Sequence, residues 1–223
     1  MLGNVLVTGG AAGLGAAVAD AVHAAGGTPL VLDKSAPDRH EFELVDLADG
    51  RAAEAAVRAL AERHGGFGGV VTAAGIDRCG TLEEVPPDEW EQVVRVNLFG
   101  TAAVVRAALP HLGNGRVVTV ASTLGLRAVS DATAYCASKF GVVGFTRALA
   151  AETAGRIGVT LVVPGGMRTN FFDDRTEQYR PQDLDKLNPP DRVAAAIVFA
   201  LSQPEGCEIR ELVIAHGEEP SYP

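Results

Sequence analysis

The chain alternates between short, unbroken apolar runs and longer Ala-rich stretches with helical spacing. The apolar runs predict seven strands, at residues 4–8, 29–33, 41–45, 70–75, 116–121, 159–163 and 211–214. Helical patterns separate most of them, at about 16–25, 49–64, 86–110, 131–155 and 191–202. Runs that are apolar throughout are typical of a parallel sheet covered on both faces. The pattern therefore predicts an α/β fold with a doubly wound parallel sheet.

The 223 residues fit one domain, 1–223, because no repeat, linker or low-complexity segment interrupts the pattern. The polar, Pro-bearing stretch 164–190 is the least periodic part. Hydrophobic residues make up 47% of the chain but aromatic residues only 5%, so we expect a core of Ala, Val and Leu.

Charge and cysteine content exclude several classes of partner. A formal net charge of −9 argues against nucleic acid and anionic membrane surfaces. No apolar run approaches the roughly 18 residues of a membrane span, and the first strand leaves no room for a signal peptide. Neither the three Cys nor the five His show metal-ligand spacing, so we expect no metal. These observations predict a soluble, cytoplasmic protein.

A glycine-rich turn follows the first predicted strand. Gly9-Gly10-Ala11-Ala12-Gly13-Leu14-Gly15 lies between that strand and a helical stretch, which is the context a dinucleotide-binding turn requires. Glycines let the backbone approach a pyrophosphate, which then lies at the helix N-terminus. The alternative is a tight β–α turn without a ligand.

Asp33 ends the second strand, about 20 residues after the glycines, where a carboxylate can accept both ribose hydroxyls of NAD. It would repel the 2′-phosphate of NADP. Lys34 or Arg39 could instead accommodate that phosphate, although both fit solvated loop charges. We favour NAD over NADP.

Tyr135 and Lys139 are spaced i and i+4, so they lie on one face of the predicted helix. A nearby ammonium favours phenolate and would lower the phenol pKa from about 10, which suits general acid–base work. Alone, the pair is a weak signal, because such pairs are common on helix surfaces. Position supports it, since residues at several strand ends should meet at one sheet edge, where ligands bind: Gly9, Asp33, Gly75, Ser122 and Pro164.

Over nearly its whole length the chain resembles a classical short-chain dehydrogenase/reductase. Thr8-Gly9-(x)3-Gly13-x-Gly15 is similar to the family's cofactor motif, and Pro164-Gly165-Gly166-Met167-Arg168-Thr169 to its Pro-Gly-x-x-x-Thr segment. Ser122, 13 positions before Tyr135, and Asn97 in Val96-Asn97-Leu98-Phe99-Gly100 complete a likeness to its Asn–Ser–Tyr–Lys tetrad. The resemblance implies a single Rossmann-type domain with a short substrate loop at about 166–190.

The resemblance implies a role for each tetrad residue. Tyr135 would exchange a proton with the substrate oxygen, and Ser122 would hydrogen-bond that oxygen. Lys139 would lower the pKa of Tyr135 and hold the nicotinamide ribose. Asn97 would hold a water that links Lys139 to solvent. The alternatives are a strand-end Ser and an Asn that satisfies a local backbone group.

The resemblance also implies a set of cofactor contacts: Thr8, Gly9, Gly13, Leu14, Gly15, Asp33, Asp46, Leu47, Ala73, Ala74, Gly75, Tyr135, Lys139, Pro164, Gly165, Met167 and Thr169. A helix N-cap is the alternative for Asp46. Thr72-Ala73-Ala74-Gly75 stands where the family usually has Asn-Asn-Ala-Gly. That departure removes a polar side chain from the sheet and one contact to the adenosine side.

The sequence therefore predicts an NAD(P)-dependent oxidoreductase that interconverts a small-molecule secondary alcohol and a ketone. The resemblance implies a homo-oligomer, a tetramer or dimer, formed through helices near 88–110 and 131–155. One alternative is a non-catalytic NAD(P)-binding regulator, against which the intact tetrad argues. The other is a lyase-type relative such as a halohydrin dehalogenase, in which Arg replaces the Lys and the glycine motif is lost. The substrate is not readable: Arg127, Arg168 and Arg175 could bind an acidic group or serve only surface solubility.

Overall fold

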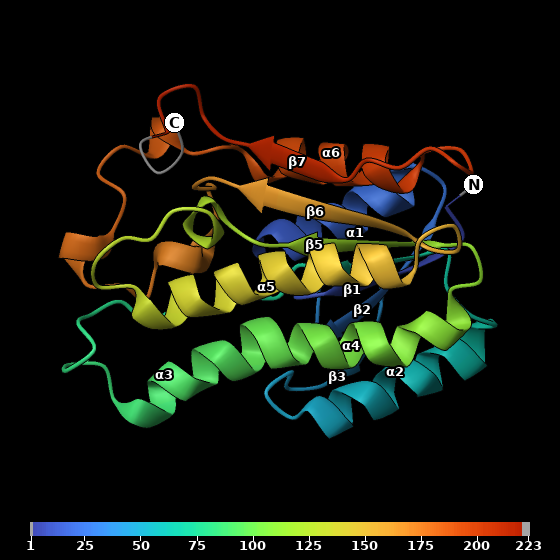
Figure 1. Cartoon of the computed structure of the whole chain (residues 1–223), viewed down its shortest axis with the longest axis horizontal. Coiled ribbons are helices and arrows are strands. Elements are labelled where there is room, and N and C mark those ends of the chain that lie inside the picture. The colour runs from blue at the N-terminus through green and yellow to red at the C-terminus, as the bar shows by residue number, and fades with distance from the viewer. Residues whose placement is uncertain (1, 220–223) are drawn as a thin grey trace.

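The computed structural model describes residues 2–219 and contains one seven-stranded sheet (Figure 1). Its strands are β1 (Asn4–Thr8), β2 (Thr28–Asp33), β3 (Glu41–Leu44), β4 (Gly69–Thr72), β5 (Arg116–Val120), β6 (Gly158–Pro164) and β7 (Glu211–Ile214). All neighbouring pairs are parallel, in the order β3-β2-β1-β4-β5-β6-β7. The predicted doubly wound parallel sheet is confirmed.

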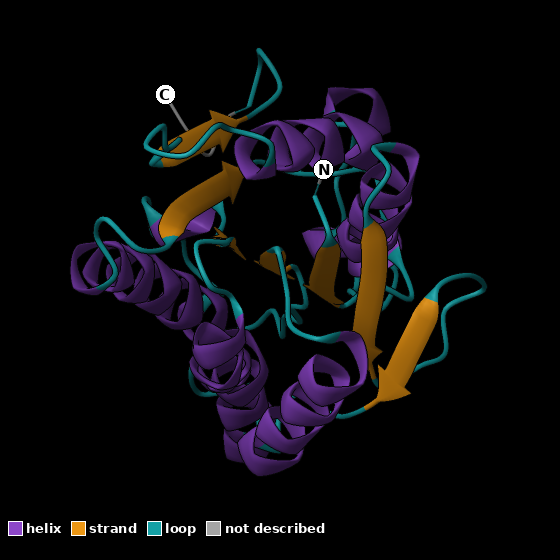
Figure 2. Cartoon of the chain, turned by 90° about the vertical axis from the view of Figure 1, so that its right-hand side faces the viewer, coloured by secondary structure: helices purple, strands orange, loops and turns teal. Residues whose placement is uncertain are grey.

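Helices cover both faces of this sheet (Figure 2). One face carries α1 (Gly13–Ala24) and α6 (Pro190–Leu201), which contact each other. The other carries α2 (Gly50–His64), α3 (Pro87–Val94), α4 (Thr101–Ala108) and α5 (Thr133–Glu152). Both layers are needed because the central strands present buried apolar side chains on both sides.

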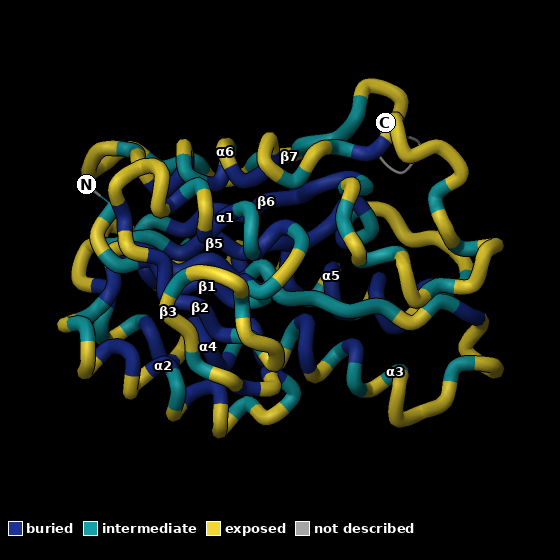
Figure 3. The backbone as a smooth tube through the Cα atoms, turned by 180° about the vertical axis from the view of Figure 1, so that it is seen from behind, coloured by how far each residue is buried: buried dark blue, intermediate teal, exposed yellow. Residues whose placement is uncertain are grey.

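Strand β1 illustrates why the apolar runs do not alternate. Val5 and Val7 pack into the hydrophobic cluster that includes α1 and α6, whereas Leu6 packs into the cluster that includes α2 and α4. All three are fully buried, and the central strands form the buried interior of the tube in Figure 3. Apart from Phe67, the buried residues of both clusters are aliphatic, as the composition predicted.

The long helix predicted at 86–110 is interrupted. Between α3 and α4 lies a π-helical segment, Arg95–Gly100, and a 3-10 turn, Leu109–His111, follows α4. A π-helical insertion adds a residue to a turn and often marks a functional site. By length and composition alone, 87–111 could cross a membrane, yet 56% of its most apolar window is buried, and its helices contact α2 and α5.

The sheet's order reverses between β1 and β4, because β2 continues from β1 on one side and β5 from β4 on the other. Such a reversal opens a crevice at the carboxyl ends of the strands. The stretch 164–190 lies at this edge and forms three short 3-10 turns, Asn170–Phe172, Glu177–Tyr179 and Leu184–Lys186. The topology therefore places the least periodic segment beside the crevice.

Candidate active site

A cleft of about 940 Å³ lies outside the carboxyl ends of the strands. Its lining includes Ser122, Tyr135 and Lys139 and every predicted cofactor contact except Thr8. Asn97 is also outside the lining. Residues far apart in the sequence thus meet at one sheet edge, as the strand-end argument predicted.

The glycine turn between β1 and α1 is shaped as a phosphate cradle. Gly9 has a φ of +72°, and a Cβ there would lie 2.8 Å from the Cα of Ala74; a Cβ on Gly15 would lie 2.1 Å from the carbonyl oxygen of Gly9. No side chain caps the N-terminus of α1, and its first turn holds no acidic residue. Its free N–H groups and positive dipole end therefore fit an anion such as a pyrophosphate.

Asp33 lies beside this turn. Its Oδ2 accepts a hydrogen bond from Ala11 N (3.0 Å) and its Oδ1 one from Ser35 N (3.0 Å). Lys34 also lines the cleft, whereas Arg39 pairs with Asp20 on α1 at 3.2 Å and is outside the lining. Of the two cations that could accommodate a 2′-phosphate, Lys34 alone is therefore in the cleft lining.

Two of the predicted contacts, Thr8 and Asp46, make local hydrogen bonds to backbone N–H groups. Thr8 is buried, and its Oγ1 accepts a hydrogen bond from Ala74 N at 3.1 Å, so it ties the turn after β4 to β1. Asp46 lines the cleft, and its Oδ1 accepts from Ala48 N. It is not a helix N-cap, because Asp49 caps α2 by accepting from Arg51 N and Ala52 N.

Ser122, Tyr135 and Lys139 come together where β5 and α5 meet the cleft. Ser122 follows β5 in extended conformation, and its Oγ accepts a hydrogen bond from Leu124 N at 3.1 Å. It is also hydrogen-bonded to the Tyr135 side chain. Lys139 Nζ donates to the carbonyl oxygen of Val120 (3.0 Å) and lies 5.6 Å from the centre of the Tyr135 ring. The three side chains form one buried polar cluster.

The protonation of this cluster differs from the sequence prediction, in which Lys139 lowers the pKa of Tyr135. Burial raises the pKa of Tyr135 above its ordinary value, against the opposing effect of the hydrogen bond with Ser122. Burial also lowers the pKa of Lys139 to about 8, and Asp77 acts in the opposite direction. Desolvation disfavours both the Tyr135 phenolate and the Lys139 ammonium. In this structure it outweighs the attraction between these two charges that the i, i+4 spacing predicted.

Asn97 lies in the π-helical segment and is 1% exposed. Its Oδ1 accepts from Ile76 N (2.8 Å), and its Nδ2 donates to Ile76 O (2.9 Å) and Ser138 Oγ (3.0 Å). The backbone group it satisfies is thus distant in the sequence rather than local. Asn97 thus joins the turn after β4 to Ser138 of α5, the residue before Lys139.

The structure adds an ion pair that sequence reasoning missed. Asp77, two residues after Gly75, pairs with Arg175 of the 164–190 segment at 2.7 Å, and both line the cleft. For Arg175 the surface role is wrong, because its side chain is only 19% exposed. Asp77 follows a strand end, which was a usable signal, but no pattern indicated its partner. Glu219, near the C-terminus, also lines the cleft and accepts a hydrogen bond from Gly166 N at 3.0 Å.

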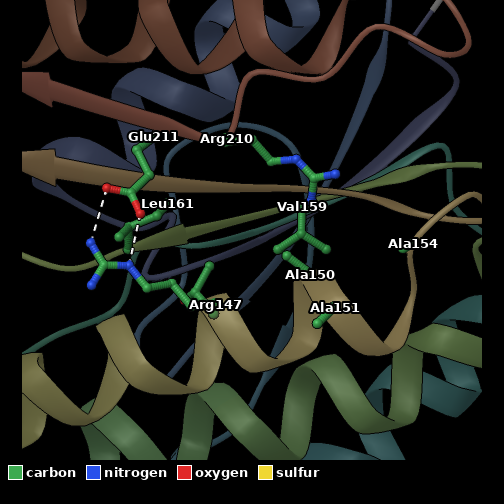
Figure 4. Close-up of a pocket in the computed structure, with 9 residues that line it drawn as sticks. Arg147, Ala150, Ala151, Ala154, Val159, Leu161, Arg210 and Glu211 are labelled. Atoms are coloured by element: carbon green, nitrogen blue, oxygen red, sulfur yellow. Dashed lines mark hydrogen bonds and ion pairs between the residues drawn. The ribbon is translucent and has the colours of Figure 1, made fainter.

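A second hollow, of about 310 Å³, lies between the end of α5 and the beginnings of β6 and β7 (Figure 4). Arg147 crosses it to Glu211, with Nε donating to Oε1 at 2.8 Å. Because this hollow is near the amino ends of the strands, it is away from the edge where such sheets bind ligands. The larger cleft is therefore the candidate active site.

Comparisons with known proteins agree with this geometry. The family model described as short chain dehydrogenase matches residues 3–180. D-threitol dehydrogenase of Mycolicibacterium smegmatis is 34% identical over 220 residues, which cover 88% of this chain and 85% of that protein. A short chain dehydrogenase of Burkholderia cenocepacia, solved in complex with NADP, is 31% identical with a TM-score of 0.84 and 96% of each chain covered. Levodione reductase is 29% identical, with a TM-score of 0.86 and 98% of each chain covered.

The matched family model covers most of the chain, and the solved relatives share its sheet and helices. The glycine turn, the Ser122–Tyr135–Lys139 cluster and the cleft lie together in this fold. The chain belongs to the classical short-chain dehydrogenase/reductase family of NAD(P)-binding oxidoreductases.

Proposed function

We propose that the protein is an NAD(P)-dependent dehydrogenase or carbonyl reductase that interconverts a secondary alcohol and a ketone. The observation that carries the proposal is the hydrogen-bonded Ser122–Tyr135 pair, with Lys139 beside it in the cleft. When bound, the nicotinamide supplies or accepts the hydride. The protein's own task is then to orient the substrate and move one proton.

In the reduction direction, the Tyr135 hydroxyl gives its proton to the substrate oxygen as a new C–H bond forms at the carbonyl carbon. The carbonyl π electron pair becomes the lone pair that accepts this proton. Ser122 donates a hydrogen bond to the same oxygen and stabilises the charge that develops there. The raised pKa of Tyr135 keeps the phenol protonated at neutral pH, which is the form that the reduction requires. Oxidation of the alcohol reverses each step.

The cleft residues fit a dinucleotide. The backbone N–H groups at the start of α1 would hold the pyrophosphate, and Asp33 would accept the ribose hydroxyls of the adenosine half. Asp46 and Leu47 would lie at the adenine, and the Pro164–Thr169 segment at the nicotinamide. Lys139 would hold the nicotinamide ribose, and Asn97 would position a water that resupplies the proton.

We propose NAD as the preferred cofactor. Asp33 supports this preference, because its carboxylate at the end of β2 would repel a 2′-phosphate. The engagement of Arg39 with Asp20 supports it as well. The Burkholderia cenocepacia relative was solved with NADP, so titration with both reduced cofactors is the necessary comparison. NADPH binding tighter than NADH would refute the preference and assign Lys34 to the phosphate.

The decisive experiment is a panel of ketones and alcohols assayed by reduced-nicotinamide absorbance, with wild-type protein and Tyr135→Phe. We expect turnover to fall at least about 100-fold in the variant, since general acid catalysis supplies factors of this size. NADH binding should be retained and serves as the folding control. Tight cofactor binding without turnover on a broad panel would instead support a non-catalytic regulator.

We also propose a homo-oligomer, a tetramer or dimer, in a cytoplasmic location. Phe99 of the π-helical segment and Phe140 of α5 are 60% and 44% exposed, which supports an apolar contact through these helices. Ala103 and Ala107, in contrast, are buried within the chain and therefore cannot contribute to a contact between subunits. A monomer mass at micromolar concentration by light scattering would refute the oligomer.

A further inference from the structure

Among the residues that the structure describes, Asp77–Arg175 is the one ion pair that joins the 164–190 segment to the turn after β4. Arg175 Nη2 lies 2.7 Å from Asp77 Oδ2, and the two side chains are 19% and 4% exposed. Both residues line the cleft. Charges that are this well buried need hydrogen-bond partners, because a buried charge left without a partner is strongly destabilising.

The pair lies close to the proposed proton-transfer site. The Phe171 ring lies 5.8 Å from the Tyr135 ring, centre to centre, and the Arg175 guanidinium carbon lies 5.3 Å from the centre of the same Phe171 ring. The charges of Asp77 and Arg175 act on the pKa of Tyr135 in opposite directions, Asp77 raising it and Arg175 lowering it. Phe171 therefore neighbours both Tyr135 and the ion pair, and all of these residues line one cleft, so a substrate with its reacting oxygen at Tyr135 can extend toward the pair.

The described part of the chain, residues 2–219, satisfies only some of the hydrogen-bond donors and acceptors of Asp77 and Arg175. Arg175 Nη1 donates to Tyr179 O at 3.3 Å, while its Nε is buried without a hydrogen-bond partner. Asp77 Oδ1 accepts from Arg78 N (2.7 Å), and Oδ2 accepts from the Cys79 thiol (3.2 Å) as well as from Arg175. A guanidinium donor and a carboxylate acceptor are thus offered side by side.

A hydroxyl group suits this arrangement because it can accept from Arg175 and donate to Asp77 at once. A carboxylate suits it poorly, since Asp77 already neutralises Arg175 and would repel a second anion. An alkyl group would leave the polar atoms unmatched, which is costly when they are buried. The pair would therefore discriminate among a hydroxyl, a carboxylate and an alkyl group on the carbon next to the reacting one.

We propose that the Asp77–Arg175 pair binds a second hydroxyl group of the substrate, so that neutral diols, polyols and the corresponding hydroxyketones are preferred. The inference rests on the proposed dehydrogenase function and assigns the specificity of that site to two residues. It also excludes the acidic substrate group that the sequence left open for Arg175.

The test compares three four-carbon secondary alcohols that differ in one substituent: butane-2,3-diol, butan-2-ol and 3-hydroxybutanoate. With wild-type protein and saturating NAD, kcat/KM for the diol should exceed that for butan-2-ol at least about tenfold, as expected for hydrogen bonds to charged groups. The value for 3-hydroxybutanoate should be lower than for butan-2-ol. A diol preference below about threefold would overturn the proposal, being smaller than one such bond provides.

Asp77→Asn leaves the Arg175 charge unmatched, so the order of substrates should change. The preference for the diol over butan-2-ol should fall about tenfold, and 3-hydroxybutanoate should gain at least about tenfold relative to butan-2-ol. Arg192→Gln is the control, because Arg192 follows the same segment, is outside the cleft lining and is 80% exposed, with Asp191 at 3.8 Å. Its substrate order should equal the wild type's. Asp77→Leu/Arg175→Met removes both charges if Asp77→Asn does not fold. It should lose the diol preference without gaining the acid.

A binding measurement separates failure of this proposal from failure of the proposed function. In Tyr135→Phe saturated with NAD, the diol should raise the melting temperature more than butan-2-ol does, and adding Asp77→Asn should abolish that difference. A difference that depends on Asp77, in a protein whose wild type turns over none of the panel, would support the binding site and refute the dehydrogenase function. Equal or absent shifts would overturn the binding site, whatever the turnover.

Discussion

Lys139 provides a test of whether burial governs the protonation of the site. In the folded protein, burial lowers its pKa from 10.5 to about 8. Lys139→Met keeps the length of the side chain but cannot titrate. The variant should therefore lack any part of the pH-dependence of stability that comes from this residue.

The sign follows from the protons bound in each state. Between pH 8 and 10.5 the unfolded chain keeps the Lys139 proton while the folded protein loses it, so the free energy of unfolding rises with pH. With these pKa values, the rise between pH 7 and 9.5 is about 2 kcal/mol, at 1.36 kcal/mol per pH unit of full titration. The stability of the wild type relative to Lys139→Met should increase by that amount over the window.

The assay is urea unfolding of cofactor-free protein at fixed concentration, followed by the fluorescence of Trp90, the single tryptophan. Wild type and variant are compared at pH 7, 8, 8.75 and 9.5, so that titrations common to both cancel. In melting temperature the relative change should be about 4–8 °C for a chain of this size. Lys34→Met, at an exposed lysine, is the control and should follow the wild type.

Parallel pH profiles for wild type and Lys139→Met, within about 0.5 kcal/mol, would refute the reasoning, because that is the usual limit for independent effects. The folded-state pKa of Lys139 would then lie close to its unfolded value. The hydrogen bond to Val120 O would have offset the desolvation of the ammonium.

Three further substitutions test other parts of the site. Gly15→Ala should destabilise the protein by about 3 kcal/mol in urea unfolding, because its Cβ would lie 2.1 Å from Gly9 O. Gly144→Ala, in open space on α5, should be neutral or stabilising. Equal effects of the two substitutions would contradict the cradle geometry. Asn97→Ala should lower the free energy of unfolding by about 3 kcal/mol, since it leaves the N–H and C=O of Ile76 unpaired. A loss below about 1 kcal/mol in the same assay would show that these hydrogen bonds do not hold the turn after β4. Asp33→Ser should raise NADPH affinity relative to NADH at least about tenfold in fluorescence titrations, because a like charge is removed; an unchanged ratio would rule out Asp33 as the discriminating residue.

Much of the fold could be predicted because its determinants are local or periodic. An apolar run such as 116–121 marks a strand buried on both faces wherever it occurs, and β5 begins at its first residue. The glycine turn is equally local, since its shape depends on backbone conformations that side chains would block. The family resemblance predicted that Ser122, Tyr135 and Lys139 share one site. The interruption at Arg95–Gly100 was missed, because a π-helical insertion leaves the apolar pattern nearly unchanged.

Other features depended on which segments the fold brings together. The sequence by itself determined the α/β alternation, the phosphate-binding turn and the i, i+4 relation of Tyr135 and Lys139, because each involves residues that are neighbours along the chain. Only the tertiary structure decided that Asp77 meets Arg175, 98 residues away, and that Asn97 holds Ile76. It also reversed the expected direction of the Tyr135 pKa, since desolvation depends on all the segments that exclude water from the phenol. Charge pairing along a helix can be read from spacing, but burial is a property of the whole packed molecule.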